Sequence, residues 1–536
     1  MRRKLRVFSN IAIITLSVCM FAFGVYAAST VSVTTSGTIR FEATGVYASI
    51  TRRVTGNVGD DIVNGPITIG SDATSPVVMG NNETLEFENA TTSIVMTFTI
   101  KNEATEQGRI LYATLIDNEN VAPNNVSIVS EQLGSEIEIE PGQTKTIVIT
   151  LSVQEPNNSA SAEYDYTISL KNSSMFTMLN DTNATFKLTT TKKVSTFDQE
   201  GNECYTESAI TFYTLDTISN AELTKVTIPE TYNNIPVMGI SNKAFKNNAI
   251  IESIRIPNSI CEVAKDAFDG TKLIYIDNDI RYVKSATNSH HICVGMVDDA
   301  TITFLSIHND TKIIASNAFN SYFDDTSVGM LTIPDNCLAI GSYAFAYNSF
   351  TDLSLNDKVI YIGDHAMDGC HYMTPYSLSL PNSLTFMGVF AFNDMGSYQA
   401  DARINLSIGS GLKYLPYCGF YGAPIVGSLT IPGTVESVEG NCFGCNRLTS
   451  ITIEEGVKYI GGALNSNGVC QADSAFMGSE NMSISIPSTV LSLGPNSFGG
   501  TQGTRSVYVM YSGSSWETLI ENSHEQALAS CTISGV

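Results

Sequence analysis

The side chains with the greatest capacity for chemistry in this 536-residue sequence are its six histidines and eleven cysteines. His290 and His291 precede Asp298 and Asp299, and imidazole together with carboxylate groups can bind a metal ion. The alternative is a solvated loop, which is favoured because the spacing matches no metal motif such as HExxH. The prediction is therefore a chain without a metal site and without a cofactor.

Cys442-Phe-Gly-Cys445 has the spacing of a thiol–disulfide site. Such a site places its cysteines at the start of a helix that follows a strand. Cys442 instead occupies a position that recurs along the chain as a small residue, so a buried structural cysteine is favoured. Ten cysteines remain once residues 1–28 are removed, and we expect one or two disulfides among them at most.

The other candidates for chemistry are acidic pairs. Asp277-Asn-Asp279 and Asp324-Asp325 offer oxygen ligands for calcium, but neither stretch supplies the full loop that this ion requires. The sequence contains no GxSxG and no phosphate-binding glycine loop. We predict no catalytic residue and a protein that is not an enzyme, with a hydrolase site in the insertion 284–303 as an alternative.

The formal net charge is −24 and the pI is near 4.6. This balance excludes nucleic acid partners, because phosphates require clustered lysine and arginine. Residues 1–28 have the pattern of a signal peptide, with a basic start, an apolar run from Ile11 to Val25, and small residues at Ala27 and Ala28. We expect a secreted or cell-surface protein with no membrane span after cleavage.

Residues 29–192 alternate apolar and polar side chains with a period of two, most clearly at 93–102, 135–153 and 162–172. This period places one side of each strand on a core and the other in water. Short strands separated by turns such as Pro141-Gly142 predict a β-sandwich. The stretch IEIEPGQTKTIVITL within it resembles bacterial immunoglobulin-like modules.

After residue 225 the sequence repeats an apolar–x–apolar triplet that proline often follows. The eleven copies begin at Val226, Ile254, Ile274, Leu305, Leu331, Leu353, Leu378, Leu406, Leu429, Ile451 and Ile484. Twelve residues after most triplets an aromatic side chain appears, at Phe268, Phe319, Phe345, Phe392, Phe420, Phe443 and Phe498. One unit cannot bury these side chains, but stacked copies can. The repeat therefore predicts a solenoid in which each coil adds one short strand to a parallel sheet.

The stretches LTIPDNCLAIGSYAF (331–345), LTIPGTVESVEGNCFGC (429–445) and VTIPETYNNIPVMGISNKAF (226–245) resemble BspA-type leucine-rich repeats, common on bacterial cell surfaces. The resemblance implies a curved solenoid that contacts proteins or cells, and it supplies no catalytic residues. The third and tenth units, at Ile274 and Ile451, depart from the pattern, and those coils are expected to be distorted.

The predicted fold class is mainly β, with an N-terminal β-sandwich followed by a leucine-rich-repeat solenoid with a parallel sheet. The predicted organisation is a signal peptide at 1–28, an immunoglobulin-like β-sandwich at 29–192, a linker and N-terminal cap at 193–225, the solenoid at 226–520 and a tail at 521–536.

The middle residue of each triplet must point away from the core, because side chains alternate along a strand. We predict that the resulting strip binds a partner, through Arg255, Tyr275, Ser306, Thr332, Ser354, Ser379, Ser407 and Thr430. The alternative is that small hydroxyl residues simply suit exposed strands.

Together these features predict a non-enzymatic, monomeric, extracellular binding or adhesion protein whose partner is a protein or a glycan. A structural component of an extracellular or biofilm matrix, in which the first domain polymerises, is the alternative.

Overall fold

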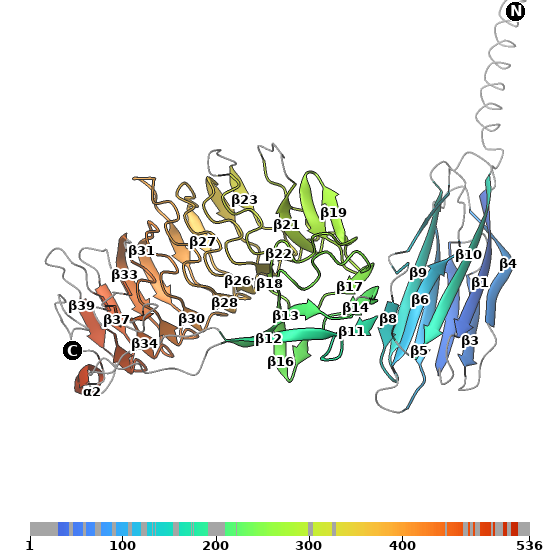
Figure 1. Ribbon diagram of the computed structural model, residues 1–536, viewed down its shortest axis with the longest axis horizontal. Coiled ribbons are helices and arrows are strands. Elements are labelled where there is room, and N and C mark those ends of the chain that lie inside the picture. Colours follow the sequence, from blue (N-terminus) through green and yellow to red (C-terminus); the bar gives the residue numbers. More distant parts are fainter. Residues whose placement is uncertain are drawn as a thin grey trace, which may run out of the picture. The chain divides into compact units, whose positions relative to one another are not determined.

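A computed structural model shows the chain as two compact units, Met1–Met175 and Phe176–Val536 (Figure 1). The structure describes residues 31–41, 47–56, 61–69, 77–87, 93–105, 110–118, 126–130, 132–133, 136–153, 160–172, 174, 176–190, 210–220, 222–297, 304–323, 329–444, 447–461, 463–464, 470–471, 475–476, 483–494, 497–498, 508–511, 516–521 and 523. The predicted signal peptide, residues 1–28, lies outside the described residues, and so does almost all of the predicted tail.

The first unit consists of two five-stranded sheets. One sheet has the order β4(Val77–Glu86), β1(Val31–Phe41), β10(Ala160–Lys171), β6(Leu111–Asp117), β8(Glu136–Ile139). The other has the order β3(Ile62–Ile69), β2(Ala48–Thr55), β5(Ser93–Asn102), β9(Thr144–Val153), β7(Val126–Val129). β1 and β10 run parallel, whereas the other paired neighbours run antiparallel.

A single apolar core lies between these two sheets. Ile39 and Ile168 come from the first sheet, and Phe98 and Ile149 from the second. Burial alternates strictly along β5, as the period of two predicts. The two sheets therefore share one core. The likeness of this unit to immunoglobulin modules stays a prediction.

The first unit ends before the predicted boundary at residue 192. β11(Thr177–Met178) runs parallel to β14(Lys225–Thr227), and β12(Ala184–Thr190) pairs with β13(Thr211–Ile218). These pairings place 176–190 in the second unit, where they extend the predicted N-terminal cap. No local sequence pattern marks this boundary, because β12 alternates polar and apolar residues just as the strands before it do.

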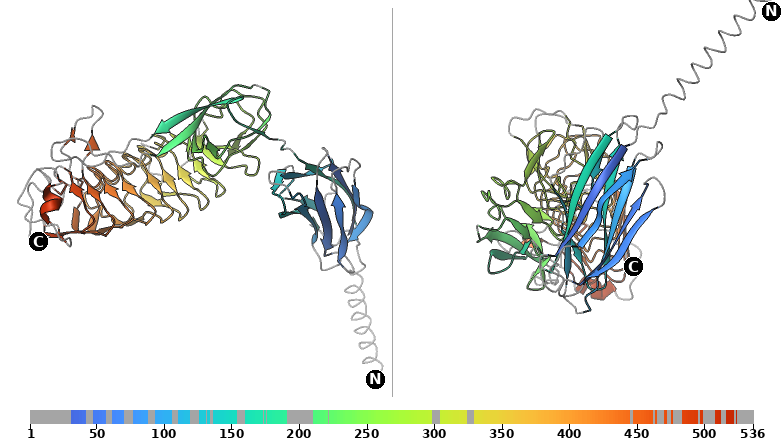
Figure 2. Two further views of the ribbon diagram at one scale, coloured as in Figure 1. Left: turned by 90° about the horizontal axis from the view of Figure 1, so that it is seen from below. Right: turned by 90° about the vertical axis from the view of Figure 1, so that its right-hand side faces the viewer.

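The triplets of the second unit form a column of parallel strands, and Figure 2 shows successive coils side by side. These strands are β14, β17(Ser253–Arg255), β23(Met330–Thr332), β25(Asp352–Ser354), β27(Ser377–Ser379), β29(Asn405–Ser407), β31(Val426–Ile431), β33(Arg447–Ile453) and β37(Ser483–Ile486). β39(Tyr508–Tyr511) pairs with β37 and extends the column beyond the last predicted triplet. The predicted parallel solenoid is confirmed.

Each coil also carries a second strand that the sequence analysis did not predict. This second column contains β16(Ile235–Ile240), β18(Glu262–Val263), β22(Ile313–Ile314), β24(Ala339–Ile340), β26(Tyr361–Ile362), β28(Phe386–Met387), β30(Tyr414–Leu415), β32(Ser437–Val438), β34(Tyr459–Ile460) and β38(Ser492–Leu493). Most of these strands have two residues, which is too short for a periodicity of two to appear.

A recurring glycine after the second strand allows the coils to approach one another. A Cβ atom on Gly341 would lie 2.5 Å from the Ser316 nitrogen, and one on Gly363 would lie 2.5 Å from the Ser342 nitrogen. Contacts this short to backbone atoms leave no room for a side chain. The apolar–glycine pair is thus the local sign of the second strand.

The aromatic residue of each coil lies at the centre of the solenoid. Stacked pairs are Phe245–Phe268, Phe319–Phe345, Phe392–Phe420, Phe420–Phe443, Phe443–Phe476 and Phe476–Phe498, with ring centroids 4.7–5.9 Å apart. Phe476 restores the ladder in the tenth unit after the β35(Ala463–Leu464) and β36(Cys470–Gln471) hairpin. The rings and the triplet residues belong to one continuous core.

Two predicted triplets do not form parallel strands. The third triplet lies in β19(Ile274–Asp277), which pairs antiparallel with β20(Ile280–Val283), and the fourth, at 305–307, has no strand. β20 pairs antiparallel with β21(Ile292–Met296). β21 in turn pairs parallel with β22, which belongs to the second column. The expected distortion of the third unit is thus a three-stranded insertion.

The remaining elements close the unit. β15(Thr231–Tyr232) forms a hairpin with β16 in the first coil. The one helix in the described part of the chain, α2(Trp516–Glu521), contributes Leu519 to the core. No helix among the described residues is long and apolar enough to cross a membrane.

Replacing the central ring of one coil should destabilise the repeat unit. Phe345 is fully buried and stacks on Phe319 with centroids 5.3 Å apart. We expect Phe345→Ala to lower the free energy of unfolding by about 3–5 kcal/mol, because it leaves a cavity. Urea denaturation followed by circular dichroism measures the loss. Tyr376→Ala, at an 81% exposed ring, is the control. Equal midpoints for the two variants would contradict a ring-filled interior.

Candidate binding face

The middle residues of the triplets lie on the outside of the solenoid. Ser379 is exposed while its neighbours Leu378 and Leu380 are buried, and the same alternation holds around Thr332 and Thr430. Ser407 is exposed between the buried Leu406 and the half-buried Ile408. Ser306 and Ser354 are exposed as well. The predicted direction of these side chains is confirmed, whereas their role in binding a partner stays a prediction.

Hydroxyl groups on this face connect neighbouring coils. The Ser407 hydroxyl donates to the Ser379 hydroxyl at 2.9 Å across β27 and β29, and Ser450 donates to Ser428 at 2.6 Å across β31 and β33. Such exposed bonds are weak, because water competes for the same groups. They leave hydroxyl oxygen atoms available to accept hydrogen bonds from a partner.

The strip of middle residues is interrupted near the N-terminal end of the solenoid. The Arg255 guanidinium is only half-exposed and lies 4.3 Å above the Phe176 ring. Tyr275 belongs to the antiparallel insertion and packs edge-on against His290. Because the insertion replaces the parallel strand of the third coil, Arg255 and Tyr275 are not continuous with the serines and threonines that follow.

A shallow groove of about 500 Å³ opens where β25, β27 and β29 end. Its lining consists of Leu355, Asn356, Asp357, Ser379, Leu380, Pro381, Asn382, Ser407, Ile408 and Gly409. Two residues of the predicted strip, Ser379 and Ser407, therefore lie in the groove. The lining offers hydroxyl, amide and carboxylate groups but no histidine, lysine, arginine or cysteine, which is a composition suited to hydrogen bonding with a neutral polar ligand.

Exposed tyrosines that the sequence analysis did not single out lie around the start of β27. Tyr376 directly precedes this strand and is 81% exposed. Tyr398 is 64% exposed, stacks on His371 at 4.0 Å and meets Tyr372 edge-on at 5.7 Å. These residues fall outside the repeated positions, so periodicity could not identify them. Exposed aromatic rings of this kind are enriched in binding sites.

The histidines expected in a solvated loop are buried. His290 and His291 are each 8% exposed, while Asp298 and Asp299 lie outside the described residues. Burial lowers the pKa of His291 to about 4, so this side chain is neutral at pH 7. Burial, and then the charge of His308, lowers the pKa of His290.

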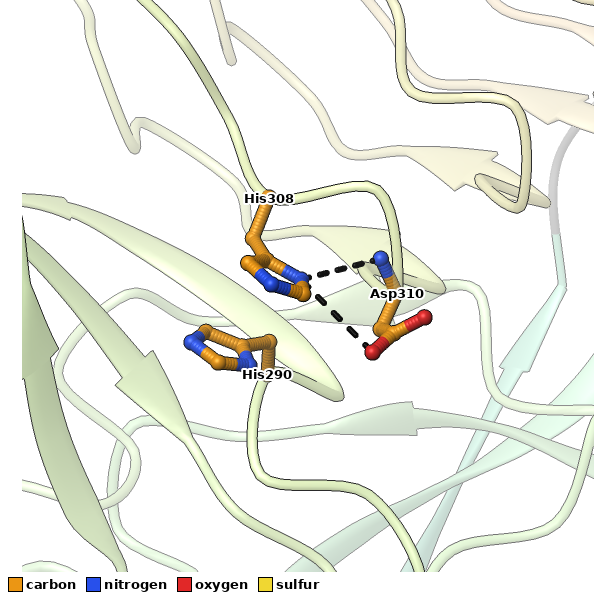
Figure 3. A group of neighbouring side chains, drawn as sticks. All are labelled: His290, His308 and Asp310. Atoms are coloured by element: carbon orange, nitrogen blue, oxygen red, sulfur yellow. Dashed lines mark hydrogen bonds and ion pairs between the residues drawn. The ribbon is translucent and has the colours of Figure 1, made fainter. Parts of the chain in front are cut away.

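His290 instead meets His308 and Asp310, residues distant in the sequence (Figure 3). The two rings are stacked with centroids 3.7 Å apart and planes 7° apart. His308 Nδ1 accepts a hydrogen bond from the Asp310 backbone nitrogen at 3.1 Å and lies 3.7 Å from Asp310 Oδ2. The insertion creates this cluster, because it carries His290 back to the coil that begins at Leu305.

A model of the BspA type Leucine rich repeat region matches residues 217–294, 290–403, 377–470 and 471–534, with six copies of the repeat. These matches span more than half of the chain. The chain belongs to this family. The BspA-type repeats coincide with the two strand columns and the phenylalanine ladder described above. No curated protein matches the sequence significantly.

Solved structures with a similar repeat come from bacteria. A leucine-rich repeat protein from Bacteroides ovatus is 17% identical, with a TM-score of 0.30 over 67% of this chain and 81% of that chain. The Pneumococcal vaccine antigen PcpA is 15% identical, with a TM-score of 0.27 over 63% and 88%. A leucine-rich repeat protein from Eubacterium ventriosum is 14% identical, with a TM-score of 0.26 over 61% and 91%. The family assignment does not depend on these likenesses.

The BspA-type coils contain buried cysteines. Among the described residues, Cys261, Cys293, Cys337, Cys370 and Cys442 are buried thiols outside any disulfide. Burial raises the pKa of Cys370 to about 12 and that of Cys442 well above its ordinary value. The structural role predicted for Cys442 agrees with this burial, and Cys445 lies outside the described residues.

These thiols should resist alkylation in the folded protein, because the thiolate is the reactive form. Iodoacetamide at pH 8 should leave Cys337, Cys370 and Cys442 unmodified in the native chain and modify them in urea. Peptide mapping by mass spectrometry measures the extent at each site. Native-state labelling of Cys442 as fast as in urea would mean that this thiol is accessible and reactive.

Proposed function

We propose that this chain is a non-enzymatic binding protein that acts outside the bacterial cell as a monomer. Its repeat unit binds an extracellular protein or glycan through the exposed strand face, and the protein reaches its location through a cleaved signal peptide at residues 1–28. Membership of the BspA-type repeat family supports this proposal, as does the acidic charge of −24, which disfavours nucleic acid.

The observation that carries the proposal is that the triplet of a regular coil has both buried and exposed positions. In the regular coils the flanking residues are buried in the shared core, as Leu378 and Leu380 are, whereas middle residues such as Ser379, Thr332 and Thr430 are exposed. Substitutions at such exposed positions can adapt the surface to a partner with little effect on the stability of the fold. Solenoids use such extended surfaces for binding.

The centre of the proposed binding face is the groove beside β25, β27 and β29. Ser379 and Ser407 line it, Asn356 and Asn382 add amide groups, and Asp357 adds one carboxylate. Tyr376 stands at the opposite end of β27 and offers an exposed ring. A partner that covers this three-residue strand would contact hydroxyl, amide and aromatic groups together, which is a combination typical of binding sites.

No cofactor takes part in the proposed function. The groove lining holds one carboxylate, Asp357, and no histidine or cysteine that could act as its partner in catalysis. Binding in this proposal depends on shape, hydrogen bonding and contact with the Tyr376 ring.

The proposal is tested by blocking the face with a bulky side chain. The mature chain is immobilised, and its partners are isolated from extracellular matrix proteins, cell envelopes and glycan arrays. We expect Ser379→Trp and Ser407→Trp to weaken binding of the strongest partner by about tenfold or more, because each fills the groove. Surface plasmon resonance measures the Kd.

The matched control is Ala249→Trp, which places the same ring at an exposed position after Phe245, outside the groove lining and the group of exposed tyrosines near β27. It should bind as tightly as the unmodified chain. Equal weakening by Ser379→Trp and Ala249→Trp, or no saturable partner in any of the three pools, would refute binding at this face.

A further inference from the structure

We propose that His290, His308 and Asp310 form a binding site for a divalent transition-metal ion of the zinc class. The three side chains each offer a ligand atom, and these atoms all lie within 4.8 Å of one another. The site is separate from the proposed binding face and does not depend on it.

The imidazole of His290 is already held in place. It is 8% exposed, and Tyr282 and Tyr275 pack edge-on against it at 4.8 and 5.3 Å. Its Nδ1 atom shares a hydrogen bond with the Ser289 hydroxyl at 2.9 Å. Histidines that bind a metal ion through one ring nitrogen usually form a hydrogen bond to an oxygen atom with the other, and this bond fixes the orientation of the ring. Nδ1 of His290 has such a bond, which leaves Nε2 to bind the ion.

The second nitrogen of His290 faces a carboxylate but forms no well-aligned hydrogen bond. Nε2 is buried, and its neighbour Asp277 Oδ2 lies 3.4 Å away. Buried nitrogen atoms in native proteins usually have a partner with good geometry. A metal ion bound between this nitrogen and the nearby carboxylates would satisfy both.

His308 and Asp310 lie on the more open side of the cluster. Their side chains are 37% and 61% exposed, so both can adjust their positions at little cost. His308 Nδ1 lies 3.7 Å from Asp310 Oδ2, and it would give up its hydrogen bond from the Asp310 backbone nitrogen in order to bind an ion. Asp277 Oδ2 lies 3.4 Å from His290 Nε2. Two ligands about 2.0–2.1 Å from a tetrahedral zinc ion are separated by roughly 3.4 Å, so both pairs are near the required spacing.

One movement is required before both histidines can bind the same ion. Figure 3 shows the His290 and His308 rings face to face, and their planes differ by only 7°. Nitrogen lone pairs lie in the plane of the ring, so parallel rings cannot direct them to one point. Because His290 is enclosed and His308 is not, we infer that His308 rotates about its Cβ–Cγ bond when the ion binds.

The donor set favours zinc, copper or nickel over calcium and magnesium. Two imidazoles and one carboxylate suit the former ions, whereas the latter prefer oxygen ligands alone. Asp277 or water would complete the coordination. The ion would link the insertion β19–β21 to the turn before β22, where the column of triplet strands is interrupted.

The test uses the full mature chain and its His308→Ala variant, measured by isothermal titration with zinc chloride. His308 is chosen because its side chain is half-exposed, so the variant keeps the buried partners of His290. The control is His371→Ala, at a histidine that stacks on Tyr398 far along the sequence. Circular dichroism confirms that all three proteins are folded.

We expect one zinc site in the unmodified chain and in His371→Ala, and at least about a tenfold loss of affinity at this site in His308→Ala. Cobalt should give the intense visible absorption of a tetrahedral site in the first two proteins only. Equal zinc affinity in all three proteins, or no zinc binding by the unmodified chain, would overturn the proposal.

Discussion

The whole repeat unit depends on each coil being completed by its neighbours. A triplet, a two-residue strand and one phenylalanine cannot enclose a core, but stacked coils bury all three in one continuous interior. The glycines after the second strands are part of the same constraint. Gly341 and Gly363 stand against the backbone of the preceding coil, and a side chain at either position would push the coils apart. Stability in such an array comes mainly from contacts between neighbours.

Because packing between coils constrains only the buried positions, the residues on the outside of each coil can vary. Exposed residues between buried neighbours on a triplet strand, such as Ser379 and Thr332, contribute little to stability and can be selected for contact with a partner. The same holds for residues outside the repeated positions, such as Tyr376 and Tyr398. A rigid interior and a variable exterior are what an extended binding surface requires, because a preorganised face loses little entropy when a partner binds.

The third coil is the point at which the regular arrangement is replaced. Its triplet enters the antiparallel hairpin β19–β20 instead of the parallel column. The return path through β21 buries His290 between tyrosines and brings it to His308 and Asp310. The proposed metal site is therefore a consequence of the insertion β19–β21, which replaces the parallel strand of the third coil.

Much of this architecture follows from the sequence alone. Regular spacing predicted the solenoid, the direction of the strip residues and the buried Cys442, because a periodic pattern of burial leaves a periodic pattern of residue types. Features without a period needed the tertiary structure. The two-residue strands, the transfer of β11 and β12 to the second unit, the packing of Arg255 on Phe176 and the meeting of His290 with His308 all depend on contacts between residues far apart in the chain. Such contacts are set by how the coils stack in space, and apart from the apolar–glycine pair after some two-residue strands they leave little local signal in the sequence.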